Sequence, residues 1–367
     1  METEHRVYVG DSRQMGRLND DSIELVVTSP PYPMIEMWDD VFGDLNSTIG
    51  NSLNDGDAQT AFELMHEELN ETWQEVSRVL VEGGIACINI GDATRKIDGS
   101  FRVYQNHARI IDTFEELGFE PLPDILWRKP VNSAAKFMGS GMLPPNAYPT
   151  LEHEYILIFR NGQKQRSFEP KADQRYNAAY FWEERNEWFS DVWMDIRGTL
   201  QSLSNNELRE RSAAFPLEIP YRLISMYSVY GDTVLDPFWG TGTTSLAAMV
   251  AGRNSVGYEL QEEFTDVFNE RVTEIDTMSR KIINERLGRH RDFINSREED
   301  GDSLNYSSTN YDFPVMTKQE KRIQFYVVDH VERTDDAYVL THSEFNDSNE
   351  FEQSSMEEQS TLGTDFT

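Results

Sequence analysis

The chain has 367 residues, with 65 Asp and Glu against 33 Lys and Arg, which gives a formal net charge of −32. No apolar run reaches the roughly 18 residues that a membrane span needs, and the first residues lack the basic and apolar regions of a signal peptide. The single cysteine, Cys87, excludes disulfide scaffolds and cysteine-based zinc sites. We therefore expect a cytoplasmic protein with no membrane partner and no bound metal.

The acidic residues are unevenly distributed along the chain. Counting Lys and Arg against Asp and Glu gives net charges of −17 for residues 1–125, +1 for 126–222, −4 for 223–295 and −12 for 296–367. Such acidity disfavours nucleic-acid binding in ordinary cytosol, but near 1 M salt the Debye length is only about 3 Å and self-repulsion is screened. The composition therefore fits a salt-loaded cell, and residues 126–222 are spared the excess acid.

Two short strands are predicted near the start of the chain. The first, at residues 7–9, ends at Gly10-Asp11, a pattern that by itself also fits a turn. The second, at residues 23–27, runs into a loop whose two prolines fix φ and lack N–H groups, so the loop is stiff and extended. Its carbonyls, the Ser29 hydroxyl and the Tyr32 ring suit a planar ring that carries an amino group. A proline-rich turn with Tyr32 packed in the core fits the same pattern.

Buried strands and amphipathic helices then alternate. Their apolar spacing predicts, after an irregular loop over residues 33–60, helices over 64–80 and 103–117 and strands over 85–90, 125–127 and 155–159. This alternation is typical of an α/β fold with a doubly wound, mostly parallel sheet.

Residues 160–212 have no clear periodicity and mix aromatic with basic side chains. The aromatic residues are interpreted as the core of a small insertion or, alternatively, as contacts to bases. The basic residues suit phosphate contacts, and the predicted DNA-binding residues are Arg160, Lys164, Arg166, Lys171, Arg175 and Arg185.

A strand at residues 233–236 precedes a glycine loop, a helix at 245–251 and a strand that ends at Glu259. Glycines let the backbone approach a nucleoside, and an acidic residue at the end of the next strand can accept hydrogen bonds from two ribose hydroxyls. The order of these elements predicts a nucleoside cofactor. A dinucleotide oxidoreductase would use a similar loop, but the residues on either side, Asp236-Pro237 and Thr243-Thr244, fit that fingerprint poorly.

The C-terminal part carries weaker signals. A long helix is predicted from Glu262 to about Arg286, followed by a polar linker over 296–312 and a disordered acidic tail over 343–367. Residues 323–331 and 337–340 predict a hairpin appendage to which we assign no function.

Taken together, these motifs resemble the amino-directed, S-adenosylmethionine-dependent DNA methyltransferases in the permuted β order, in which the target-amine loop precedes the cofactor loop. The matching segments are Gly10-Asp11, 28–32 (TSPPY), 127–130 (WRKP), 154–159 (EYILIF), 214–220 (AFPLEIP) and 236–244 (DPFWGTGTT). The resemblance implies a Rossmann-like class I fold. It divides the chain into a catalytic half (1–159), a target-recognition insertion (160–212) and a cofactor-binding half (213–295), and the acidic extension (296–367) lies outside the resemblance.

The resemblance also implies residue roles. The catalytic loop is Ser29, Pro30, Pro31 and Tyr32, in which Ser29 and the Pro30 carbonyl accept the amine hydrogens and Tyr32 stacks on the flipped base. Asn89 and Asp92 are candidates for orienting Ser29. The residues expected to bind S-adenosyl-L-methionine are Asp11 (adenine), Glu259 (ribose), Phe215, Pro216, Asp236, Pro237, Phe238, Gly240, Gly242 and Thr243.

The serine form of the catalytic loop is associated in this family with N4-cytosine methylation of double-stranded DNA, and the Asp or Asn forms mainly with N6-adenine. Residues 31–39 resemble archaeal members that act on CTAG, and the acidity suits a halophilic archaeon. A restriction endonuclease partner and an orphan enzyme are both consistent with the chain. N6-adenine methylation and a non-catalytic S-adenosylmethionine-binding regulator remain alternatives.

Overall fold

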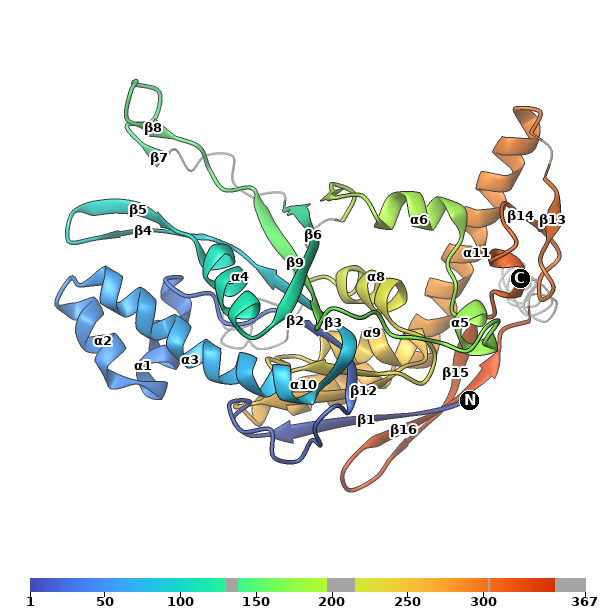
Figure 1. Ribbon diagram of the computed structural model, residues 1–367, viewed down its shortest axis with the longest axis horizontal. Coiled ribbons are helices and arrows are strands. Elements are labelled where there is room, and N and C mark those ends of the chain that lie inside the picture. The colour runs from blue at the N-terminus through green and yellow to red at the C-terminus, as the bar shows by residue number, and fades with distance from the viewer. Residues whose placement is uncertain (130–137, 197–214, 303, 347–367) are drawn as a thin grey trace, which may run out of the picture.

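A computed structural model of the chain describes residues 1–129, 138–196, 215–302 and 304–346. Its centre is a ten-stranded sheet (Figure 1). The strands lie in the order β10 (Val192–Trp193), β6 (Phe119–Arg128), β9 (His153–Asn161), β3 (Leu80–Ile90), β2 (Ile23–Thr28), β11 (Thr233–Asp236), β12 (Asn254–Glu259), β1 (Glu2–Val9), β16 (Tyr338–Glu344) and β15 (Tyr326–Arg333). The five strands from β3 to β1 are parallel, which confirms the predicted doubly wound α/β sheet.

Helices cover both faces of the sheet, because successive side chains of each buried strand point to opposite faces. On β2, Val26 packs against the helices that carry Trp73 and Phe114, whereas Leu25 and Val27 pack on the other face. Cys87 is fully buried on that second face, as expected of a small hydrophobic residue. The first face is covered by α3 (Ala58–Val79) and α4 (Asn106–Glu116), and the second by α8 (Glu218–Tyr227) and α9 (Thr243–Ala251).

The chain reverses its direction across the sheet between β2 and β11. After β2 the chain continues to β3 on one side, and after β11 it continues to β12 on the other. In open α/β sheets, ligands bind at the carboxyl ends of the strands at such a switch point. The loops that follow β2 and β11 are the two predicted functional loops.

Some predicted elements were wrong in extent. Residues 33–60 form short helices rather than an irregular loop, because Phe42 and Ile49 bury their side chains completely against α3. The helix predicted over 103–117 begins only at Asn106, and Val103 lies on a hairpin strand. The remaining elements of this half are η1 (Glu36–Trp38), α1 (Asp39–Leu45), α2 (Ser47–Asn54), β4 (Ala93–Ile97), β5 (Ser100–Tyr104), β7 (Met138–Gly139) and β8 (Ala147–Tyr148).

The C-terminal predictions need larger corrections. The predicted hairpin appendage is part of the main sheet, because β16 pairs antiparallel with β1 and β15 pairs with β16. The predicted linker over 296–312 includes the end of a helix and the buried Tyr311, and Phe345, which was assigned to the disordered tail, is buried too. Residues 347–367 lie outside the described part. The other elements are α10 (Glu263–Val272), α11 (Ile275–Glu299), β13 (Tyr306–Ser307), β14 (Pro314–Val315) and η2 (Glu320–Arg322).

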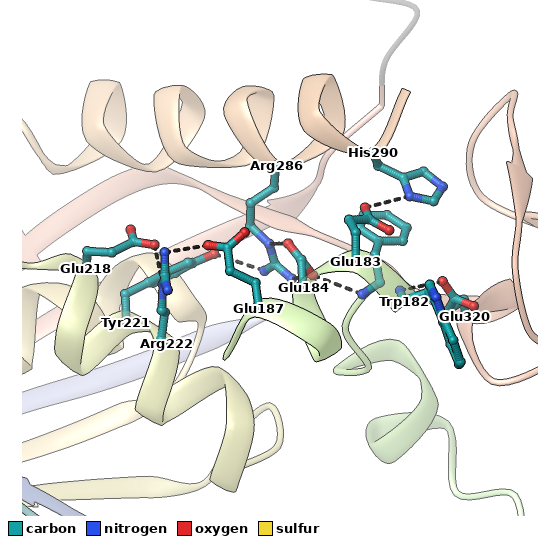
Figure 2. A network of polar contacts seen from close by, with 11 residues as sticks. Trp182, Glu183, Glu184, Glu187, Glu218, Tyr221, Arg222, Arg286, His290 and Glu320 are labelled. Carbon is teal, nitrogen blue, oxygen red and sulfur yellow. Dashed lines mark hydrogen bonds and ion pairs between the residues drawn. The ribbon is translucent and has the colours of Figure 1, made fainter. Parts of the chain in front are cut away.

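The described residues of the predicted insertion are held against the main fold by strand pairing and ion pairs. Its elements are α5 (Asp173–Asn177), α6 (Trp182–Trp188) and β10, and β10 pairs with β6 at the edge of the main sheet. Figure 2 shows how α6 is joined to α8 and α11 by ion pairs, among them Glu184–Arg286 and Glu187–Arg222. No helix in the described ranges is both long and apolar enough to cross a membrane.

Candidate active site

A cavity of about 280 Å³ lies at the carboxyl ends of β2, β11, β12 and β1. It brings together residues that are more than 200 positions apart in the sequence. Predicted catalytic and cofactor residues that line it are Ser29, Pro30, Pro31, Asp11, Phe215, Asp236, Pro237, Phe238, Gly240, Thr243 and Glu259. Three other predicted residues, Tyr32, Pro216 and Gly242, do not line it.

Asp236 joins the two functional loops. Its carboxylate accepts hydrogen bonds from the Thr28 hydroxyl at 2.6 Å and from the Thr244 hydroxyl at 2.7 Å. Burial disfavours the charged form and raises the pKa of Asp236 to about 6, although the two hydroxyls act in the opposite direction. Asp236 therefore fixes the end of β2 against the start of α9, and so sets the distance between the loops.

Glu259 organises the glycine loop. One carboxylate oxygen accepts a hydrogen bond from the Gly240 amide at 2.8 Å, and the other accepts from the Gln261 amide at 2.9 Å. Burial raises the pKa of Glu259, while these amides partly oppose the shift. Each oxygen keeps a lone pair for a further donor, as the predicted ribose contact requires.

Gly242 has a packing role instead of a lining role. It lies at φ = 73° at the start of α9, and a Cβ there would come within 2.3 Å of the Phe268 ring. A second glycine, Gly257 on β12, lies against the Trp239 indole, where a Cβ would come within 2.1 Å of the ring. The sequence motifs did not single out Gly257.

Asp11 is held by Arg13 in this structure. The guanidinium contacts the Asp11 carboxylate at 2.9 Å and 2.6 Å and also pairs with Glu68 on α3. Burial acts against ionisation, but the bonds from Arg13 outweigh it and lower the pKa of Asp11. The contact of Asp11 with a cofactor adenine stays a prediction, and Arg13 and Glu68 are lining residues that the sequence motifs did not reveal.

The catalytic loop is connected to a polar network behind it. The Ser29 hydroxyl donates to the Tyr32 oxygen at 3.1 Å, and the Asn89 amide donates to the same oxygen at 2.8 Å. Tyr32 in turn donates to Glu154 at 2.9 Å. Glu154 also accepts from Asn89 at 2.7 Å and from Lys129 at 2.8 Å.

The structure shows which neighbours these polar residues contact, and the sequence could not predict those neighbours. Lys129 and Glu154 lie within the matching motifs, but their pairing arises because β9 runs antiparallel beside β6. Asn89 on β3 donates to Tyr32, the partner of Ser29, whereas Asp92 contacts His107 at 2.8 Å, and a role for either in orienting Ser29 stays a prediction. Gly91 leaves room for Tyr32, since a Cβ there would lie 3.0 Å from the tyrosine ring.

The predicted DNA-binding residues lie elsewhere. Arg160 pairs in register with Glu120 at the start of β6, at the opposite edge of the sheet from the cavity. Lys164 pairs with Glu82, and Arg166 makes a bidentate pair with Asp232 just before β11. Arg166 lines a second cavity of about 580 Å³ together with Arg175 and Arg185, and the Lys171 carbonyl accepts a hydrogen bond from Arg322. DNA contact by these six residues stays a prediction, which their placement does not favour.

The chemistry of the first cavity fits S-adenosylmethionine. Apart from the single guanidinium of Arg13, its charged lining is acidic, which suits a ligand with a sulfonium and an ammonium group. Aromatic side chains, including Trp38 and Phe238, offer surfaces for the adenine. The acidic lining residues are Asp11, Asp40, Asp44, Glu68, Asp236 and Glu259. The fold and this cavity define a class I methyltransferase with S-adenosyl-L-methionine as its cofactor.

Comparison with known proteins identifies the family. Residues 23–270 match the DNA methylase family of N6 and N4 methyltransferases, and the chain belongs to it. It is 54% identical over 328 residues to the type II methyltransferase M.MthZI of Methanothermobacter thermautotrophicus, covering 89% of this chain and 91% of the relative. It is 52% identical over 281 residues to M.MjaI of Methanocaldococcus jannaschii, covering 74% and 91%.

A solved structure supports the cofactor assignment. A putative DNA modification methylase of Thermus thermophilus, complexed with S-adenosyl-L-methionine, superimposes with a TM-score of 0.58 and 32% identity. The match covers 74% of this chain and 94% of that protein. The chain described here is therefore a DNA methyltransferase that uses S-adenosyl-L-methionine.

Replacing Glu259 is expected to weaken cofactor binding. Glu259→Ala should raise the KM for S-adenosylmethionine roughly 10-fold or more with little change in kcat, because ribose contacts are similar in the ground and transition states. Steady-state kinetics with varied cofactor measures both constants. The control is Glu262→Ala, an exposed residue at the start of α10, and a loss confined to kcat contradicts the ribose role.

Proposed function

We propose that this protein methylates the exocyclic N4 amine of cytosine in double-stranded DNA. The observation that carries the proposal is the direction of the hydrogen bonds around Ser29. The Tyr32 hydroxyl donates its hydrogen bond to Glu154, which also accepts from Lys129. The Tyr32 oxygen then accepts from Ser29, whose own oxygen is left as an acceptor at the cavity. An acceptor at this position is what the exocyclic amine of cytosine or of adenine requires, and the choice of cytosine rests on the serine form of the catalytic loop.

The proposed reaction starts with extrusion of the cytosine from the duplex, at a cost of a few kcal/mol. Ser29 and the Pro30 carbonyl accept the two N4 hydrogens, which turns the nitrogen lone pair toward the cofactor. The cofactor supplies an electrophilic sulfonium methyl group. In-line displacement would break the sulfur–methyl bond as the N4–methyl bond forms and would release one N4 proton to water, which needs mainly positioning and no covalent enzyme intermediate. The network behind Tyr32 holds its ring in place for stacking on the base.

Replacing Ser29 tests the assignment directly. Ser29→Ala should lower methyl transfer roughly 100-fold, because one orienting acceptor is lost, while leaving the affinity for S-adenosylmethionine near that of the wild type. Transfer is measured with radiolabelled cofactor, affinity by calorimetry, and the methylated nucleoside by mass spectrometry. Ser22→Ala, in the exposed turn before β2, is the matched control.

Two outcomes contradict the proposal. A collapse of cofactor affinity in Ser29→Ala makes Ser29 a structural residue. Detection of N6-methyladenine as the wild-type product replaces cytosine by adenine as the target. Duplexes with and without CTAG form the first substrate pair, since the proposed site rests on the likeness of residues 31–39 to archaeal CTAG enzymes.

A further inference from the structure

Two hairpins extend from the side of the sheet at which β2 and β3 end and the catalytic loop begins. The first, β4–β5, follows the carboxyl end of β3, and the second, β7–β8, lies between the end of β6 and the start of β9. Because β9 is antiparallel to both β3 and β6, all these connections leave the sheet at the same edge. In Figure 1 the β7–β8 hairpin reaches well beyond the body of the molecule. Both hairpins therefore stand beside the site where a duplex has to be bound.

A ring contact joins the hairpins into one unit. Phe101 of β5 stacks on Tyr148 of β8, with ring centroids 5.4 Å apart and an interplanar angle of 11°. Both rings are nevertheless well exposed, at 38% and 45%. We call this unit, residues 93–104 and 138–148, the paired-hairpin arm.

The charge of the arm differs from that of the rest of the chain. Residues 138–151 contain no Asp or Glu, and Asp98 is the one acidic residue among residues 93–104, although the chain has 65. On β4–β5, Lys96 is exposed, and Arg102 contacts the Gln59 amide oxygen and the Tyr104 ring. Neither cation pairs with a carboxylate within the described ranges. In so acidic a protein, this is a surface that a phosphate backbone can approach.

The tip of the second hairpin is apolar and exposed. Met142 and Leu143 are 86% and 70% exposed, the highest values among the large apolar side chains of the described residues. Proteins that unstack DNA insert side chains of this kind between bases. An extruded base also leaves a gap in the stack that such side chains can fill.

We propose that the paired-hairpin arm binds the duplex beside the target, with Lys96 and Arg102 on phosphates and Met142 and Leu143 inserted into the base stack where the target base leaves it. This inference rests on the proposed function, because it presupposes a base that is extruded from duplex DNA. Insertion of the arm's tip into the base stack would offset part of the cost of extruding the base.

The test compares two substrates. One is a fully paired duplex, and the other places the target cytosine opposite an abasic position, so that it is already unpaired. The Met142→Ser/Leu143→Ser variant should lose about 10-fold or more in kcat/KM on the paired duplex and far less on the unpaired one. Cofactor affinity should not change, because neither residue lines the cofactor cavity.

A second variant separates insertion from phosphate contact. Lys96→Gln/Arg102→Gln should weaken the binding of both substrates equally. It should also make the slope of the logarithm of the DNA-binding constant against the logarithm of the salt concentration shallower by about 1.8, or about 0.9 for each lost contact. Leu126→Ser is the control for an exposed apolar residue, because Leu126 lies on β6 outside the arm and lines neither cavity. This variant should match the wild type on both substrates.

Several results overturn the inference. If the tip variant loses kcat/KM equally on both substrates, the tip affects folding or DNA binding but does not insert into the base stack. If it loses no kcat/KM, the tip has no role in the reaction. A change from dimer to monomer in sedimentation, without discrimination between substrates, makes the tip a contact between copies of the chain. Failure of the wild type to methylate even the unpaired cytosine instead refutes the proposed function.

Discussion

Arg286→Met is expected to lower the free energy of unfolding by about 3–5 kcal/mol, because it leaves a buried carboxylate without its partner. The Arg286 guanidinium contacts both oxygens of Glu184, at 2.6 Å and 2.7 Å, and the Tyr221 hydroxyl at 3.0 Å. Only 4–5% of either Arg286 or Glu184 is accessible. Figure 2 shows that this pair links α6, α8 and α11, so its loss loosens three elements at once.

Urea denaturation of the wild type and variants measures this effect. A double variant, Glu184→Leu/Arg286→Met, should recover much of the loss, since replacing both members of a buried pair with apolar residues is often nearly neutral. The control is Arg322→Met, whose partner Asp173 is 81% exposed in its side chain, and we expect a change below about 1 kcal/mol. A small effect of Arg286→Met shows that water reaches Glu184.

The predictable part of the site was the part encoded by local sequence. The stiffness of the Ser29–Tyr32 loop and the conformational freedom of Gly240 are properties of the residues themselves, and each loop follows its own strand. Parallel strands place their carboxyl ends at one edge, so the two loops could be predicted to meet. The Asp236 bond to Thr28 joins them as this reasoning requires.

The less predictable part depends on strand pairing between distant segments. Glu154 reaches Tyr32 only because β9 inserts antiparallel between β3 and β6, and nothing near Glu154 in the sequence indicates that neighbour. The place of β16 beside β1 was missed for the same reason, since short hairpin strands do not indicate which edge they join. The neighbours of the basic residues in 160–212 could not be predicted either, because composition does not say that Arg166 pairs with Asp232.

The pairing of β16 with β1 creates two buried histidines that should make the protein unstable in acid. Thr3 on β1 contacts the Nε2 atoms of both His5 and His342 at 2.9 Å. Burial, with a smaller contribution from the facing His342, lowers the pKa of His5 to about 3. Burial, with the N-terminal ammonium group, lowers the pKa of His342 to about 4, against the opposing effect of Asp329.

The sign of the effect follows from proton binding in the two states. Above pH 7 both imidazoles are neutral whether the chain is folded or unfolded, so they contribute no pH dependence. As the pH falls through about 6.5, the unfolded chain binds protons that the folded chain excludes until about pH 4. Between these limits the free energy of unfolding should fall by up to about 2.7 kcal/mol per pH unit for the two residues together.

Comparing variants isolates this contribution from that of groups such as Asp236, whose raised pKa gives the opposite slope. A His5→Gln/His342→Gln variant keeps amide groups that can bond Thr3 but cannot take up a proton. We expect its stability to fall less than that of the wild type between pH 7 and pH 4.5, by about 2–5 kcal/mol. His330→Gln, on the exposed part of β15, should retain the wild-type slope. Parallel slopes for the wild type and the double variant, in urea titrations at each pH, mean that both histidines are hydrated enough to bind protons in the folded state, and that β16 is not closely packed on β1 in solution.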